Sequence, residues 1–149
     1  MTLPSSSDTA LLMLDINIIS DLMRNPKGRS NQRLQHLLQT FPYLKVCTSL
    51  VVDCEVSFGL KRKPSKLLQQ AYADLLQVIE IIPLDLSVSS HYADVRTHLE
   101  RLGTSIGPND TLIAAHALAL DCTLVTNNEA EFRRVPGLRV ENWLVKENT

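Results

Sequence analysis

The sequence is poor in several residue types that mark particular classes of protein. It holds five glycines and no glycine-rich phosphate loop, and no serine or cysteine stands in a pattern that pairs it with a histidine as a nucleophile. Its three cysteines, Cys47, Cys54 and Cys122, lack the spacing of zinc ligands. We therefore predict three buried, reduced thiols in a cytoplasmic protein, and neither disulfides nor a zinc site. The four histidines are scattered, and we expect His116 to be a packed, hydrogen-bonded residue.

Long hydrophobic runs are also missing. Although 44% of the residues are apolar, no run approaches the length of a membrane-spanning helix, so we expect no membrane association. The first nine residues, MTLPSSSDT, have neither the basic nor the apolar region of a signal peptide. We predict that residues 1–9 form a disordered N-terminal lead and that residues 10–145 form a single domain.

Charge is unevenly distributed, although the formal net charge is only −1. Between residues 24 and 66, nine basic residues accompany only two acids, Asp53 and Glu55, whereas the rest of the chain is acidic. The nine basic residues are Arg24, Lys27, Arg29, Arg33, Lys45, Lys61, Arg62, Lys63 and Lys66. Such a segment fits either a face that binds an anionic partner or an ordinary solvated surface.

Hydrophobic periodicity predicts strands that alternate with helices. Five short apolar runs have the character of strands: 10–14, 43–49, 78–84, 122–126 and 138–143. Helical patterns lie between them, over 17–23, 30–40 (capped by Ser30), 51–61, 65–77, 88–102 and 112–120. This alternation predicts an α/β fold with a mostly parallel sheet of about five strands and helices on both faces.

Acidic residues stand where these elements begin or end. Asp15 directly follows the first strand, Glu55 lies about one helical turn beyond the second, and Asp110 stands near the start of a helix. The carboxyl ends of parallel strands share one edge of the sheet, so the three carboxylates can meet there. Clustered carboxylates repel one another unless a cation lies between them, and oxygen ligands suit Mg²⁺ or Mn²⁺. Because such a metal activates water against phosphodiesters, the pattern predicts a metal-dependent nuclease.

Each of these acids also has a simpler interpretation. Asp15 would serve equally as a helix cap, and Asp53 is an alternative to Glu55. Asn109 and Asp110 both stand where a single capping residue suffices. We expect Asn109 to contribute to the cap and Asp110 to bind the metal.

The sequence resembles the VapC toxins of bacterial toxin–antitoxin pairs, which are PIN-domain ribonucleases. Four segments carry the resemblance, in the same order: LLMLDINIISDLM, CEVSFGLKRK, GTSIGPNDTLIAAHALA and TLVTNNEAEFRRVPGLRVENW. The resemblance covers nearly the whole chain and implies a three-layer PIN-like fold. It also implies a Mg²⁺-dependent endoribonuclease that is neutralised by a small VapB-like antitoxin and commonly forms a homodimer. VapC relatives often cut structured RNAs such as transfer RNA.

The family's functional residues correspond to particular positions of this sequence. Its metal-binding acids fall on Asp15, Glu55 and Asp110. Asn17 matches an asparagine that braces the site by hydrogen bonds, and Thr126 is expected to support it from the fourth predicted strand. Asp15, Glu55 and Asp110 are therefore the predicted catalytic and metal-binding residues.

Two positions depart from the family pattern. Ile16 replaces the usual threonine and removes a hydroxyl near the first acid, and Asn128 occupies a fourth position that is often aspartate. Asn128 is expected to bind the metal through a water molecule, with help from Glu131. Glu55 fits the pattern better than its neighbouring acid because Gly59 follows it four residues later, as in the family.

The resemblance implies a function for part of the basic segment. Lys61, Arg62, Lys63 and Lys66 follow the Glu55 helix, and we expect them to contact RNA phosphates. An antitoxin helix is expected in an apolar groove near helices 17–23 and 35–40. The alternative is that Leu34, Leu37 and Leu38 belong only to the hydrophobic core. Two alternatives remain open: a nuclease-inactive PIN module that binds RNA or its antitoxin, and a small-molecule phosphatase.

Overall fold

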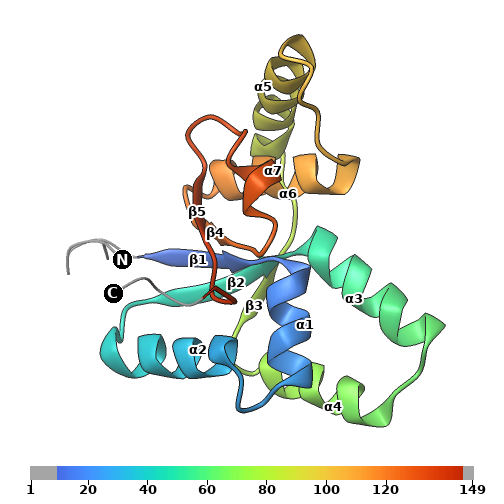
Figure 1. Ribbon diagram of the computed structural model, residues 1–149, viewed down its shortest axis with the longest axis vertical. Coiled ribbons are helices and arrows are strands. Elements are labelled where there is room, and N and C mark those ends of the chain that lie inside the picture. The colour runs from blue at the N-terminus through green and yellow to red at the C-terminus, as the bar shows by residue number, and fades with distance from the viewer. Residues whose placement is uncertain (1–9, 146–149) are drawn as a thin grey trace.

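The computed structural model describes residues 10–145, so the predicted lead at residues 1–9 lies outside the described part of the chain. Five strands form one parallel sheet in the order β3-β2-β1-β4-β5 (Figure 1). The strands are β1 (Leu11–Leu14), β2 (Lys45–Ser49), β3 (Glu80–Ile82), β4 (Thr123–Val125) and β5 (Arg139–Glu141). The helices are α1 (Ile16–Arg24), α2 (Arg29–Thr40), α3 (Leu50–Arg62), α4 (Lys66–Leu75), α5 (Ser87–Arg101), α6 (Pro108–Ala119) and α7 (Glu129–Phe132). The predicted α/β architecture with a five-stranded parallel sheet is confirmed.

β1 lies at the centre of the sheet. Leu12, Met13 and Leu14 are all buried, and Leu12 pairs with Val46 of β2 on one side and Thr123 of β4 on the other. A strand covered on both faces needs no alternation of polar and apolar residues, which explains its continuous apolar sequence. The central position of β1 puts the residue that follows it in the middle of the carboxyl edge.

Helices cover both faces of the sheet. Figure 1 shows α1, α2 and α4 on one side and α5, α6 and α7 on the other, with α5 extending away from the body. α5 packs mainly against α6, and α3 contacts α6, α1 and the strands β2 and β3. α3 therefore joins the two layers at the end of the sheet where the predicted acids stand. Among the described residues, no helix combines the length and the apolar character that a membrane span requires.

The start of α6 differs from the prediction. This helix begins at Pro108, earlier than the predicted Leu112, and its N-cap is Gly107. Proline suits the first helical turn because its missing N–H would have had no partner there. Asn109 and Asp110 therefore lie inside the first turn, and the expectation that Asn109 contributes to the cap is wrong.

Three smaller expectations are also corrected. Gly28 caps α2, whereas Ser30 is buried in the first turn of that helix. Cys47 and Cys122 are buried as predicted, but Cys54 is exposed because it lies on the outer face of α3. The helix predicted over 88–102 ends at Arg101, and Leu102, its C-cap, is 63% exposed.

Candidate active site at the carboxyl edge of the sheet

Asp15 is the most buried acid of the site. It is 2% exposed, caps α1 and lies directly beyond β1. Its Oδ1 accepts a hydrogen bond from the Ile16 amide at 2.8 Å, and its Oδ2 accepts one from the Thr126 hydroxyl at 2.7 Å. These bonds lower the pKa of Asp15, but burial raises it by more. The capping interpretation is therefore correct, and it leaves a carboxylate whose desolvation is only partly compensated.

Asn17 and Thr126 hold Asp15 from both sides. The Asn17 Nδ2 lies 3.4 Å from the Thr126 hydroxyl and 3.5 Å from Asp15 Oδ2. The Asn17 Oδ1 accepts a hydrogen bond from the Asn127 amide at 2.9 Å. The Thr126 hydroxyl also accepts one from the Asn128 amide at 3.0 Å. The structure thus places both predicted supporting residues against the first acid, and they fix the loop that follows β4.

Asp110 faces this centre from the first turn of α6. Burial raises the pKa of Asp110 to about 6, with further contributions from the charges of Asp15 and Glu131 and from a hydrogen bond shared with Glu131. An acid in the first helical turn ordinarily gains from the helix dipole, which favours its ionised form. Burial and the neighbouring carboxylates act in the opposite direction and favour the protonated form of Asp110.

Glu55 lies on α3, as predicted, and is half-buried. Its Oε1 is buried and accepts no hydrogen bond from the described residues. Burial raises the pKa of Glu55, and the charges of Asp15 and Asp110 raise it further. The competing acid, Asp53, instead accepts a 2.7 Å hydrogen bond from the Tyr72 hydroxyl. Asp53 therefore joins α3 to α4, and Glu55 is the acid of α3 that faces the other two.

The fourth predicted position, Asn128, contacts a further acid, and its binding of a metal through water stays a prediction. The Asn128 side chain donates a 2.8 Å hydrogen bond to Glu131 Oε2, so its amide is turned toward this carboxylate. Glu131, on the short helix α7, is the group that lies against Asp110. Asn128 thus orients an acid, and Glu131 is the fourth acid of the cluster. Asn142 was missed in the sequence, and it donates to Asn127 Oδ1 and to Glu129 Oε2.

The four carboxylates suit a hard cation in charge and in donor type. Among residues 10–145, no group of three or more His, Cys, Asp or Glu side chains is arranged closely enough to hold a metal ion. Neighbouring carboxylates nevertheless raise the pKa of Glu55 and of Asp110, and Glu55 Oε1 is buried with no partner among the described residues. A divalent cation would supply the missing positive charge, and an all-oxygen donor set is the one that Mg²⁺ prefers. Metal binding by these residues stays a prediction.

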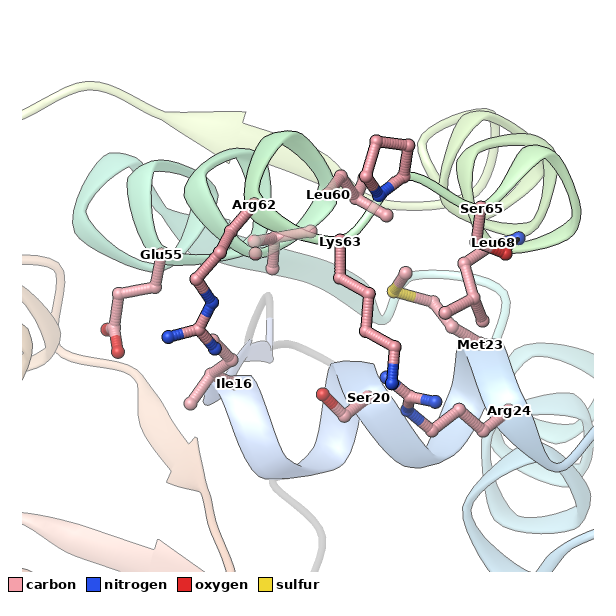
Figure 2. A pocket seen from close by; sticks show the side chains of 13 residues that line it. Ile16, Ser20, Met23, Arg24, Glu55, Leu60, Arg62, Lys63, Ser65 and Leu68 are labelled. Carbon is pink, nitrogen blue, oxygen red and sulfur yellow. Dashed lines mark hydrogen bonds between the residues drawn. The ribbon is translucent and has the colours of Figure 1, made fainter.

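A groove of about 370 Å³ leads away from Glu55 between α1, α3 and α4. Figure 2 shows Arg62 and Lys63 of the predicted basic cluster in this groove, together with Arg24 from α1. Lys61 and Lys66 are exposed and do not line it.

The groove matches the expected antitoxin site only in part. α1 lines it, but no residue of α2 does. Leu34 and Leu37 of α2 are instead buried in the core, as the simpler interpretation of those leucines required.

Comparison with known proteins identifies the family of this chain. Residues 12–138 match the PIN domain family. The chain is 41% identical to Ribonuclease VapC2 of Rickettsia felis over 135 residues, which cover 89% of this chain and 98% of the relative. It is 30% identical to the tRNA(fMet)-specific endonuclease VapC of Salmonella typhimurium, with 88% and 96% covered.

Solved structures give the same result. A chain of VapBC2 from Rickettsia felis, determined with a promoter DNA fragment, superposes with a TM-score of 0.82 at 34% identity, covering 89% of this chain and 98% of that one. VapBC-1 from nontypeable Haemophilus influenzae gives a TM-score of 0.77 at 29% identity, with 91% and 99% covered. With its parallel sheet and its acids at the carboxyl edge, the chain therefore belongs to the PIN-domain family, among the VapC ribonucleases.

Proposed function

We propose that the chain is the toxin of a toxin–antitoxin pair and hydrolyses RNA phosphodiester bonds with Mg²⁺, or with Mn²⁺ in its place. One observation carries the proposal: Asp15, Glu55 and Asp110 come from three elements to one edge, where the charge of Asp15 raises the pKa of both Glu55 and Asp110. Like charges brought together in this way destabilise a protein unless a cation joins them. The relatives named as ribonucleases support RNA as the substrate.

Each residue has a defined part in this proposal. Asp15, Glu55, Asp110 and Glu131 would hold the metal, which when bound would supply a Lewis acid that activates water. The Thr126 hydroxyl favours the ionised form of Asp15, which is the form that binds a cation.

The departures from the family pattern do not favour an inactive module. Ile16 lacks a hydroxyl, but Thr126 supplies one to Asp15 at 2.7 Å. Asn128 lacks a charge, but it holds Glu131 beside Asp110. These two contacts support an active site despite the departures.

Transfer RNA and an antitoxin are the proposed partners. One relative is named a tRNA(fMet)-specific endonuclease, and the similar solved structures include VapBC assemblies. This similarity supports a VapB-like antitoxin as partner, and a homodimer is proposed from the family resemblance alone. Four basic residues are proposed to contact RNA phosphates: Lys61, Arg62, Lys63 and Lys66.

The test uses purified chain with total RNA and with transfer RNA, in Mg²⁺ and in EDTA. We expect internal cuts in Mg²⁺ and intact RNA in EDTA. RNA that binds tightly but stays intact in Mg²⁺ would replace the proposal with a binding module. Expression of the chain alone should arrest growth, and coexpression with a small neighbouring open reading frame should restore it. A chain that is soluble and harmless would contradict the toxin assignment.

A further inference from the structure

Two basic side chains face each other across the groove beside the candidate active site. Arg24 lies at the end of α1, and Lys63 follows the last turn of α3 as its C-cap. Figure 2 shows the Lys63 side chain extending across the groove toward Arg24. Both residues are exposed, and among the described residues that line the groove Glu55 is the one acid. Arg24 and Lys63 therefore line the same groove, in which Glu55 supplies the one negative charge among the described lining residues.

The simplest explanation for these cations covers only part of the arrangement. A basic residue at a helix C-terminus stabilises the helix dipole, and this accounts for one cation at each helix end. It does not account for two helices that direct their terminal cations at each other across one groove. Two cations that lie this close repel each other. An anion between them attracts both, and these attractions outweigh the repulsion.

We propose that Arg24 and Lys63 form a phosphate-binding subsite for the RNA strand on one side of the cut bond. This inference rests on the proposed ribonuclease function. A phosphate between the two cations would accept hydrogen bonds from the guanidinium and the ammonium group, as charge-assisted pairs do. Ser20 lies on the same wall of the groove and presents its hydroxyl to it (Figure 2).

The groove connects this subsite to the acids. Its lining begins at Glu55 and Ile16 and passes Arg62 before it reaches Arg24 and Lys63. A strand whose phosphodiester lies at the acids therefore enters a channel with positive charge along its length. The channel walls also contain apolar groups that a ribose or a base can contact: Met23, Leu60 and Leu68. The basic residues spaced along the groove match the regularly repeated phosphates of a nucleic acid. A peptide carries no such regular repeat of negative charge, so the groove favours a nucleic acid.

The test measures binding in an Asp110→Asn background, so that cutting does not obscure affinity. The probe is a series of oligouridylates of increasing length, which are single-stranded. Arg24→Gln with Lys63→Gln should lower the slope of log affinity against log salt by about 0.7, because the pair binds one phosphate and each single-strand phosphate contact contributes roughly 0.7. The effect should vanish for oligonucleotides too short to reach from the acids into the groove.

The matched control removes the same charges nearby. Lys27→Gln with Arg29→Gln also replaces one lysine and one arginine close to the end of α1, at exposed positions outside the groove. This pair should change the slope by less than half as much. Since all four positions are exposed, both pairs should melt within a few degrees of the parent chain.

Three outcomes would overturn the subsite. If the native chain cuts RNA but the groove pair binds oligouridylate like the control pair, the subsite is wrong and the proposed function stands. If the groove pair loses affinity for oligoglutamate while it keeps its affinity for oligouridylate, the groove serves an acidic peptide. If no variant and no native preparation binds RNA, the proposed function and the subsite fall together.

Discussion

The His116 Nδ1 lies 2.8 Å from the Ser49 hydroxyl, in a fully buried contact. This contact joins α6, which carries Asp110, to the N-cap of α3, which carries Glu55. Burial lowers the pKa of His116, and the Pro83 backbone partly opposes that shift. A neutral histidine thus sets the spacing between two helices that carry acids.

Replacing His116 with alanine should destabilise the fold. The change leaves buried polar groups without their partner, which costs about 1–3 kcal/mol. The free energy of unfolding from urea titration measures this loss. His98→Ala, at an exposed position on α5, is the matched control and should be nearly silent. Equal stability of the two variants would show that the His116 contact contributes nothing.

The lowered pKa of His116 predicts that the protein loses stability in acid. Burial lowers the pKa of His116 below its unfolded value of 6.5, so below that pH the unfolded chain binds a proton that the folded chain does not. The stabilisation is therefore complete above pH 6.5 and falls as the pH drops toward the folded pKa. The native chain should lose stability over this window faster than His116→Ala does. Parallel pH profiles for the two proteins would contradict the assignment.

Asp110→Asn should separate a catalytic acid from a helix residue. Loss of the charge at the first turn costs roughly 0.3–1 kcal/mol through the helix dipole, but it also removes repulsion with Asp15 and Glu131. We expect metal-free Asp110→Asn to melt at or above the native temperature. RNA cleavage should fall by more than the roughly 10–100-fold that loss of an outer-shell partner causes. Asp94→Asn, on the exposed surface of α5, should cut at the native rate. Normal cleavage by Asp110→Asn would remove this residue from the site.

Metal binding should follow the ionisation of Asp110. The pKa of this carboxyl is raised from 3.8 to about 6, so its contribution to metal-free stability is complete below pH 3.8 and is lost as the pH rises through 6. Mg²⁺ requires the ionised carboxylate, so its stabilising effect should appear as the pH rises through this range. The measurement is the melting temperature with and without Mg²⁺ on both sides of pH 6. A Mg²⁺ effect that is equally large well below pH 6 would contradict it.

Glu131 and Asn128 should differ in their contributions. Glu131→Gln removes the charge beside Asp110 and should reduce cleavage about as strongly as loss of Asp110 itself. Asn128→Ala removes only the 2.8 Å hydrogen bond that orients Glu131. We expect that variant to lose about 10–100-fold, as is usual for an outer-shell partner. Cleavage rates at saturating Mg²⁺ compare the two variants, and a larger effect of Asn128→Ala would restore Asn128 as the ligand.

The sequence was most informative where residues stand next to long elements. Asp15 and Asp110 could be placed because an apolar strand and an apolar helix adjoin them, and parallel strands share an edge. Glu131 received only a minor role because α7 spans four residues, too short to show a periodic pattern. The sequence pattern also could not distinguish Lys63, which lines the groove, from Lys61, which does not. That distinction depends on how α3 packs against α1.

The bond between Thr126 and Asp15 spans 111 residues of sequence. Because β1 pairs with β4, Asp15 lacks its Thr126 hydrogen bond until β4 has joined the sheet. Bringing together residues so far apart in sequence carries the entropic cost of closing a long loop. A partly folded chain in which only β1, β2 and β3 have paired therefore has a first acid without this support. The candidate site is completed only when the fourth strand is in place.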